Sequence, residues 1–598
     1  MSSPSSEQGF LIRRAILVPS ISSSVEQAIN IERRFRNRIL DLVKIIEYGG
    51  ATMGDDRNNL FRLSNNITST DMIDMIPPLI FSFDDWAMNV QLPHFFFHYY
   101  GFHDRHLNEL VSAMYRKVSV STLQKSYIQD SITGRKLKRI VFVSCLFGGD
   151  EPHGLLILDV LKRLPKDIFE IIAMGVGVKR PESEFLDAVA AYYHVGNDST
   201  KASILLTSLQ PNCVVFMEHV NNGIMQFLLF QRYAEIQILC MGAPITSGVL
   251  SIDYFISGDR LEHPFRTQLS GDQILYEPYT EQVVLLDGQA ISFPKNQYYP
   301  TQDDLLAAGE ARGAVTSLGE NTNFTGETFE FSVNSSVPIY MCFQSLFKLH
   351  PLFDTIITKI LIADPYGIIL LQSARDYSKT KRVIDRLIKS VSTDLCIDES
   401  SPCPEAKAIL SRIYFIPRVK SNKLLQLFQK ATVILHPFPF DGSKTASDVI
   451  NASVPLVTFP TEYLRGRMAQ NFFITMALHE IDENVAATAC CVASDPSDYI
   501  SKVIRLGKDR KYRAKVSHAI SQRKNRIFDD DQVAFEWARF LCRALGIRIN
   551  TEDLAQRMNY NPEYWQRDTV LNEEMIRLQR HWKRSSLLEH VIRRRVLL

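Results

Sequence analysis

Residues 436–450 combine side chains and turns that suit the binding of a phosphorylated ligand. The apolar residues 432–435 predict a strand, and the Pro and Gly residues up to Gly442 predict a turn into a helix. The first turn of a helix exposes unpaired N–H groups and the positive end of the helix dipole, so it attracts anions. A capped helix that binds no ligand has the same residue types, and that alternative stays open at this point.

The side chains of this segment predict a more specific ligand, a nucleoside diphosphate. The hydroxyls of Ser443 and Thr445 and the cation of Lys444 are suited to hydrogen bonds with phosphate oxygens. Asp448 follows one helical turn later, and its carboxylate can accept hydrogen bonds from the hydroxyls of a ribose. Gly442 stands at the turn between strand and helix, where a small residue is expected.

Two series of short apolar runs predict the elements that position this segment. Continuous rather than alternating apolarity is typical of parallel strands buried on both faces, and the helix-length stretches between the runs predict βαβ repetition. The fold class is therefore α/β, with two Rossmann-like doubly wound domains and a central cleft where the strands' carboxyl ends meet. The runs are 140–143, 169–174, 213–216, 236–240 and 254–256 in the first series, and 339–343, 368–371, 413–416, 433–435 and 456–459 in the second.

Changes in composition along the chain predict four regions. Residues 1–135 are mainly helical, residues 136–320 form the first Rossmann-like domain and residues 321–545 form the second. A polar stretch rich in Gly, Thr and Asn separates the two domains. Residues 546–598 are predicted to be a helical, basic tail.

The overall composition narrows the function classes and the compartment. The chain has 598 residues and a formal net charge of +1, which gives no support for a nucleic-acid partner. No uncharged apolar run is long enough for a membrane span, and the polar start lacks a secretory signal, so we expect a cytoplasmic or nuclear protein without a membrane partner. The nine cysteines are scattered without a CxxC pair, which predicts free thiols in a reducing compartment.

Several motifs stand in an order that resembles one enzyme family. Any one of these motifs is weakly specific, but together and in order they carry the resemblance. They are residues 100–105, 141–144, 242–248, 279–285, 343–348 and the segment from 436 that continues through 452–467. Over roughly residues 95 to 545 the chain resembles the catalytic region of the protein O-linked N-acetylglucosaminyltransferase and SPINDLY family, glycosyltransferase family 41, without its tetratricopeptide repeats.

This resemblance implies a GT-B fold and metal-independent, inverting transfer of a sugar from a nucleotide sugar to Ser or Thr hydroxyls of a protein or peptide. UDP-N-acetylglucosamine is the favoured donor, GDP-fucose is possible, and UDP-glucose transferred to asparagine is a third option. The acceptor side is expected in the first domain and the nucleotide sugar in the second, and no cofactor is expected. Two rivals remain open: a catalytically silent sugar-nucleotide-binding scaffold, and a GT-B enzyme that acts on small molecules or glycans.

The resemblance also implies roles for individual residues. Lys348 matches the family's lysine that contacts the donor phosphates, where a fixed cation can stabilise the leaving diphosphate. His153 or Asp150 is the expected base, and Glu218 and His219 are possible cleft contacts. The remaining donor-binding residues implied are Gln344, Gly442, Thr445, Asp448, Glu462, Arg467, Gly242, Pro244, Thr246, Ser247 and Gly248.

The chain departs from the family pattern at two places. Ser443 and Lys444 replace residues that are histidine or glycine and then threonine in the family, although both remain suited to phosphate. The family's histidine that stacks on uracil is missing, and residues 421–424 stand in its place. The identity of the base in the donor therefore stays open between uracil and guanine.

Overall fold

The structure is a computed structural model of the 598-residue chain. The residues that it describes, called the described residues below, are 21–48, 93–102, 105–119, 135–147, 152–177, 181, 183–220, 222–262, 278–294, 316–317, 337–396, 401–418, 421–528 and 530–560.

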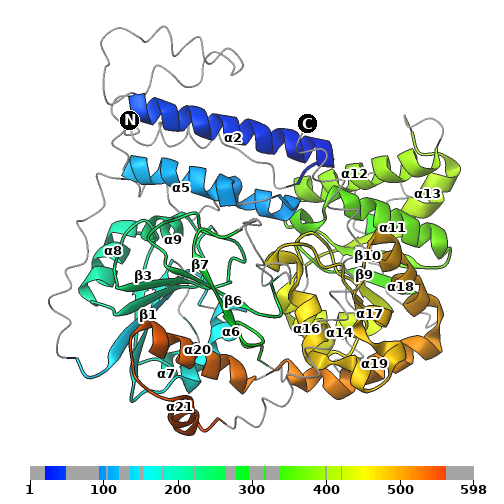
Figure 1. The fold of residues 1–598 in the computed structure, drawn as a ribbon. Coiled ribbons are helices and arrows are strands. Elements are labelled where there is room, and N and C mark those ends of the chain that lie inside the picture. The colour runs from blue at the N-terminus through cyan, green and yellow to red at the C-terminus, as the bar shows by residue number, and fades with distance from the viewer. Residues whose placement is uncertain are drawn as a thin grey trace, which may run out of the picture.

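The first sheet has seven parallel strands in the order β3-β2-β1-β4-β5-β6-β7 (Figure 1). Its central strands are apolar throughout and fully buried, as β4 shows, which confirms the parallel arrangement that the apolar runs predict. Successive strands are added on one side of β1 up to β3 and on its other side from β4 onwards, so the strand order reverses between β1 and β4. Ligands of such sheets bind at the carboxyl ends of the strands beside that point. The strands are β1 Lys138–Ser144, β2 Phe169–Val176, β3 Ala191–Val195, β4 Cys213–Phe216, β5 Ile236–Leu239, β6 Tyr254–Gly258 and β7 Gln282–Leu286.

The second sheet has six strands in the order β13-β12-β9-β10-β11-β8. All pairs are parallel except that of β8 with β11. The order reverses between β9 and β12, so this sheet too has a switch point at its carboxyl edge. The strands are β8 Thr316–Ser317, β9 Ile339–Cys342, β10 Ile368–Gln372, β11 Ile413–Ile416, β12 Val433–Leu435 and β13 Leu456–Val457.

Helices cover both sheets and fill the connections between strands (Figure 1). In the first domain these are α6 Pro152–Arg163, α7 Ser183–Asp187, α8 Ser199–Ser208 and α9 Gly223–Leu228. In the second they are α11 Pro351–Ala363, α12 Tyr377–Leu395, α13 Pro404–Leu410, α14 Ser421–Lys430, α15 Ser443–Asn451, α16 Met468–Met476, α17 Ala487–Cys490, α18 Pro496–Lys508 and α19 Arg510–Arg523. Short 3₁₀ helices are η4 Leu346–Lys348, η5 Leu464–Gly466, η6 Leu478–Glu480, η7 Glu483–Val485 and η8 Lys524–Arg526.

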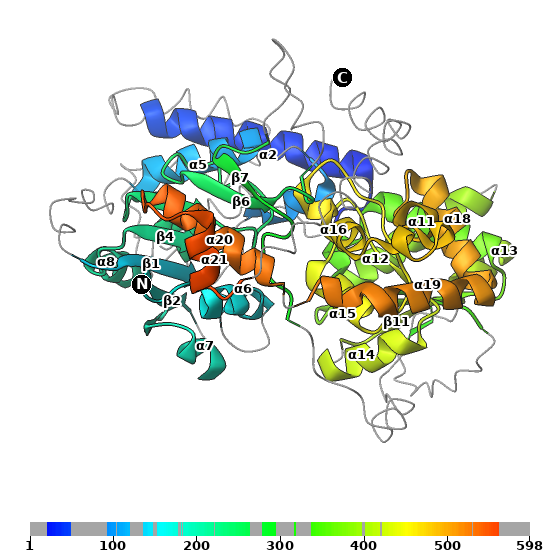
Figure 2. The same ribbon diagram turned by 60° about the horizontal axis from the view of Figure 1, so that its bottom comes forward.

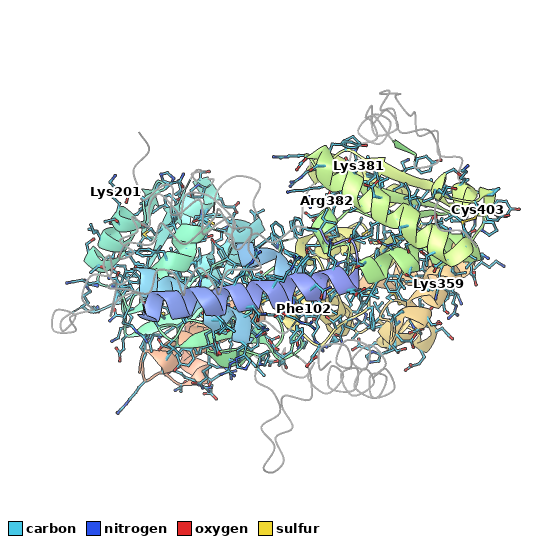
Figure 3. The ribbon with its side chains drawn as sticks, turned by 90° about the horizontal axis from the view of Figure 1, so that it is seen from above. Phe102, Lys201, Lys359, Lys381, Arg382 and Cys403 are labelled. Atoms are coloured by element: carbon cyan, nitrogen blue, oxygen red, sulfur yellow. A yellow bond between two sulfur atoms is a disulfide. The ribbon has the colours of Figure 1, made fainter. Side chains whose placement is uncertain are left out.

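The N-terminal elements lie above the two sheets. Helices α2 (Val25–Tyr48) and α5 (Arg105–Ser119) run side by side over the first domain, and α2 extends towards α12 of the second (Figures 1 and 3). Buried residues of α2, among them Phe35 and Ile39, recur at helical spacing on the face that packs inward. The 3₁₀ helix η1 (Pro93–Tyr100) joins this layer to the region between the domains.

The chain changes sheet earlier than the predicted domain boundaries at 320 and 545. Strand β8 already belongs to the second sheet. Helix α20 (Asp531–Ala544) returns to the first domain, where the Trp537 Nε1–H donates to Ala290 O at 2.9 Å. Figure 2 shows α20 beside α6, and α21 (Thr551–Arg557) packs against α20. The chain therefore crosses from the second domain back to the first after α19, and its C-terminal helices pack on the first domain.

The cysteines correct one sequence prediction. Five are free, and four of those five are buried, as expected of small apolar side chains. Cys396 and Cys403, however, form a disulfide between the end of α12 and the start of α13, and the adjacent Cys490 and Cys491 form a second. Spacing along the chain does not reveal the first of these pairs, because the turn between α12 and α13 brings its two sulfurs together. Among the described residues, no helix combines the length and apolarity that crossing a membrane requires.

Candidate active site

A cavity of about 210 Å³ lies between the two sheets, and residues from three parts of the chain line it. Its walls are mainly apolar or aromatic, and a few charged and polar groups interrupt them. The lining residues are Phe95, His98, Tyr99, Leu156, Met217, Val220, Met241, Gly242, Ala243, Pro244, Ile245, Ile291, Lys348, Phe440, Asp441, Ser443, Arg465 and Met468. Apolar walls with a few convergent polar groups are typical of small-molecule sites.

Lys348 and the loop before Gly442, which the resemblance assigns to the donor, lie together at this cavity. Lys348 ends η4, directly after strand β9, and its Nζ donates to the Asp441 carbonyl oxygen at 2.7 Å. The same ammonium lies 4.9 Å from the centre of the Phe440 ring, which stacks on Tyr99 at a centroid distance of 4.2 Å. Burial lowers the pKa of Lys348, and the neighbouring Asp441 opposes that shift. The cation is thus held in one position on the cavity wall.

The start of α15 presents its first N–H groups beside Lys348. Gly442 is the N-cap, and the first N–H to bond within the helix is that of Ala446, to Gly442 O at 2.9 Å. The Gly442 N–H itself donates to His436 Nε2 at 3.1 Å. A Cβ at Gly442 would stand 2.2 Å from the Gln344 Nε2, so any larger residue here would displace the Gln344 side chain. Gln344 therefore packs against the loop instead of lining the cavity.

The rest of this segment is arranged differently from the predicted cradle. Ser443 lines the cavity, but Thr445 and Asp448 are not among the lining residues. Lys444 Nζ and Asp448 Oδ1 form an ion pair at 2.5 Å one turn apart on α15. A ribose would have to share the Asp448 carboxylate with Lys444.

The loop from Gly242 to Gly248 divides between the cavity and the core. Gly242 and Pro244 line the cavity. Thr246 and Ser247 instead bind the buried Glu281 carboxylate, through the Thr246 hydroxyl at 2.7 Å and the Ser247 N–H at 2.8 Å. Gly248 has φ +70°, and a Cβ there would come within 2.3 Å of the Asn108 backbone. These last three residues hold the loop against α5.

The two arginines after β13 have separate roles. Arg467, which the sequence analysis assigns to the donor, is buried, and its Nε donates to Leu261 O at 2.8 Å and a terminal nitrogen to Glu262 O at 3.3 Å in the first domain. Arg465 lines the cavity and donates to Phe102 O at 2.6 Å. Glu462 is half-buried and is not a lining residue. The cavity cation is therefore two residues earlier than predicted.

Glu218 and His219 follow strand β4 but stay behind the cavity wall that Met217 and Val220 form. The Glu218 carboxylate accepts from the Ser144 hydroxyl at 2.8 Å and from the Cys145 N–H at 2.6 Å. His219 lies between Gln226 Oε1 at 3.0 Å and Ile245 O at 3.4 Å.

His98 of η1 is a cavity residue that the sequence analysis missed. It is 1% exposed and lines the cavity with Phe95, three residues earlier on the same side of a 3₁₀ turn. The concentration of aromatic and histidine residues at 93–100 was the available signal. Of the predicted bases, His153 lies in the first turn of α6 but its side chain is outside what the structure describes, and Asp150 falls outside the described residues.

Three buried histidines each contribute a part of the stability that is lost in acid. Burial lowers the pKa of His219 to about 4, of His350 to about 3 and of His436 to about 3, all below the unfolded value of about 6.5. Below pH ~6.5 the unfolded state binds more protons, so the unfolding free energy falls as the pH falls towards ~4. The expected slope is up to roughly 1.4 kcal/mol per pH unit for each histidine.

Urea denaturation at about pH 7 and pH 5.5 measures this slope. His350 caps α11 by accepting from the Leu352 N–H at 3.3 Å, and asparagine can accept the same bond. His350→Asn should therefore lower the slope of the unfolding free energy against pH by the contribution of one histidine, up to roughly 1.4 kcal/mol per pH unit. Buried carboxylates such as Asp354, whose pKa burial raises to about 6, contribute the opposite slope, so the test is the difference between the two proteins. Equal slopes for the wild type and His350→Asn would contradict the prediction.

The described residues contain no group of three or more His, Cys, Asp or Glu side chains placed to hold a metal ion. The acidic group on the cavity wall is Asp441, and its neighbours there are cations and apolar side chains. This arrangement can hold an anion against Lys348, Arg465 and the start of α15.

The whole fold is similar to that of a lysine-to-methionine mutant of the O-GlcNAc transferase of Thermobaculum terrenum, with a TM-score of 0.57 and 14% identity over 90% of this chain and 85% of that one. The chain has the GT-B fold. Anabaena HepE in complex with UDP and glucose aligns with a TM-score of 0.40 and 11% identity, over 68% of this chain and 100% of that one. No protein-family model matches this sequence, and neither does a curated protein. The likeness establishes the fold, and the activity is a separate question.

Proposed function

We propose that this protein transfers a sugar from a nucleotide-sugar donor to Ser or Thr hydroxyls of proteins, with N-acetylglucosamine from UDP-N-acetylglucosamine as the favoured donor sugar. One observation carries the proposal: a buried lysine and the first turn of a helix converge on one cavity between two Rossmann-like sheets. Lys348 comes from the end of β9 and Ser443 from the connection after β12, on either side of the switch point of the second sheet. That is where such sheets bind phosphorylated ligands.

The charges of the site suit the departure of a nucleoside diphosphate. When the bond between the sugar and the diphosphate breaks, its electron pair stays with the diphosphate oxygen, which gains about one negative charge. Lys348 and Arg465 are cations on the cavity wall, and α15 adds the positive end of its dipole. Groups that are already fixed in place stabilise such developing charge most effectively.

The acceptor hydroxyl would approach the sugar from the first domain. Its oxygen attacks the anomeric carbon as the diphosphate leaves, and its proton must pass to a base. His98 lines the cavity, and an imidazole nitrogen can accept a proton from a hydroxyl. His98 is therefore the candidate base among the described residues.

The cavity is smaller than the roughly 300–1,000 Å³ of most ligand pockets. Its volume of about 210 Å³ is too small for a whole nucleotide sugar, so we expect the nucleoside to lie beyond it, along α15 and α14. Residues 421–424 at the start of α14 lack the stacking histidine that the uridine-binding family members carry. GDP-fucose is therefore the second donor to test.

Mass spectrometry of a cell lysate incubated with the protein and a panel of nucleotide sugars tests the proposal. We expect a mass increase of one sugar residue on Ser or Thr of lysate proteins with UDP-N-acetylglucosamine or GDP-fucose, and none with Lys348→Ala. A panel in which no sugar reaches a protein would contradict protein transfer, and products on small molecules alone would favour a GT-B enzyme of that kind.

The proposed chemistry does not use a metal, which gives a second test. Lys348 and Arg465 supply the positive charge that a divalent ion supplies in other enzymes. Transfer should therefore continue at an unchanged rate after dialysis against EDTA. A complete loss of turnover that manganese restores would show that the leaving diphosphate is stabilised by an ion instead.

A further inference from the structure

Asp441, which carries a carboxylate, lines the cavity where the proposed diphosphate would bind. Among the described residues that line this cavity, Asp441 is the acidic one, and it is 2% exposed. Burial raises the pKa of Asp441 to about 7, so its carboxylate is largely ionised at about pH 8. A buried negative charge repels an anionic ligand strongly, because the surroundings screen it poorly. Asp441 therefore opposes the attraction that Lys348 and Arg465 exert on an anion in the same cavity.

The structure holds Asp441 firmly in this place. The Asp441 N–H donates to Arg465 O at 2.8 Å, and its carbonyl oxygen accepts from Lys348 Nζ at 2.7 Å. Its carboxylate accepts from the Ala469 N–H at 3.1 Å, at the start of α16. The Ala469 bond holds the carboxylate, and the two bonds to the Asp441 backbone hold the loop that carries it.

We infer that Asp441 sets the balance between donor and product: its carboxylate weakens the binding of the released nucleoside diphosphate more than that of the intact nucleotide sugar. The inference rests on the proposed function. An intact nucleotide sugar carries about two negative charges on its diphosphate, whereas a free nucleoside diphosphate carries about three near pH 8. Repulsion from one fixed charge grows in proportion to the ligand charge, so the product is repelled more.

The repulsion from Asp441 speeds product release, which the cations of the site would otherwise slow. Lys348, Arg465 and the start of α15 favour the charge that develops on the leaving diphosphate, and they favour the same charge after the reaction is over. Without opposition the product would leave slowly, and product release limits turnover in many enzymes. Asp441 opposes these groups from the same wall.

Asp441→Asn tests the inference because the amide keeps the shape and its oxygen can still accept from the Ala469 N–H. The measurement is calorimetric titration at about pH 8 with UDP, GDP, UDP-N-acetylglucosamine and GDP-fucose. If each unit of ligand charge counts for roughly threefold in affinity, the variant should bind its cognate nucleotide sugar roughly tenfold tighter and the matching nucleoside diphosphate roughly thirtyfold tighter. Inhibition of transfer by the nucleoside diphosphate should increase in parallel.

Asp495→Asn is the matched control. Asp495 is also a capping carboxylate, which accepts from the Ser497 and Asp498 N–H groups at 2.8 and 2.9 Å at the start of α18, and it does not line the cavity. Its variant should leave all nucleotide affinities unchanged. If Asp441→Asn changes thermal stability but not the ratio of product to donor affinity, Asp441 is only a helix cap and the inference is wrong. Failure of the wild type to bind any nucleotide would instead overturn the proposed function.

Discussion

Lys348→Ala is expected to lower the single-turnover rate of sugar transfer by roughly two to three orders of magnitude, the scale of losing one donor to a developing oxyanion. Donor affinity should fall much less, because Ser443, Arg465 and the start of α15 remain to hold the diphosphate. The difference arises because charge grows on the diphosphate as the bond breaks, and a fixed cation acts most where charge develops. Single-turnover kinetics beside calorimetry of donor binding separates the two effects.

Two further variants control this experiment. Lys348→Arg should not restore the rate, since a planar guanidinium cannot replace a compact ammonium that lies between Phe440 and the Asp441 carbonyl. Lys359 is exposed on α11 of the same domain (Figure 3), and Lys359→Ala should turn over like the wild type. Normal donor binding together with a near wild-type rate in Lys348→Ala would make Lys348 an ordinary structural lysine.

Arg386→Leu is expected to destabilise the protein by about 3–5 kcal/mol, as breaking one side of a buried ion pair does. Arg386 on α12 makes two hydrogen bonds to the Asp354 carboxylate, at 2.5 and 3.0 Å, and both side chains are at most 4% exposed. Burial raises the pKa of Asp354 to about 6 even beside this cation. Without Arg386 the carboxylate would stay buried with no opposite charge, and Ser22 O and Leu349 O would lose their donor.

Lys381→Ala on the same helix is the matched control (Figure 3). Lys381 pairs with Asp385, but the two side chains are 59% and 56% exposed, so the solvent-screened pair should contribute far less to stability than the buried one. The unfolding free energies of both variants can be compared by urea denaturation. Similar values for Arg386→Leu and Lys381→Ala would show that the buried pair does not hold α12 to α11. Arg386 also donates to the carbonyl of Leu349, which directly follows Lys348. Donor affinity in Arg386→Leu therefore shows whether this bond helps to position Lys348.

The central strands of both sheets could be predicted because burial on both faces leaves a continuous apolar signature. All ten apolar runs correspond to strands of the structure. The sequence analysis missed β3 and β7, which lie at the two edges of the first sheet and have partly exposed side chains. It also missed the two-residue β8, for which no run exists. An edge strand needs no continuous apolarity, so its pattern resembles that of a loop.

The candidate site was only partly predictable, because its contacts depend on how the two domains pack. Lys348 and the Gly442 loop come from one sheet, and their place at adjacent strand ends follows from its topology. Arg465 and Arg467 are two residues apart, and nothing in the sequence tells which side chain reaches the first domain and which faces the cavity. His98 arrives from the helical layer above both sheets, so only the three-dimensional structure brings it to the cavity.

The central claim is that the cavity between the two sheets binds the diphosphate of a nucleotide sugar. A crystal structure of the wild-type protein with UDP or GDP tests it most directly. We predict diphosphate oxygens within about 4 Å of Lys348 Nζ, the distance of an ion pair, and within hydrogen-bond distance of the first N–H groups of α15. A nucleotide bound elsewhere, with Lys348 still on the Asp441 carbonyl and far from phosphate, would contradict the account.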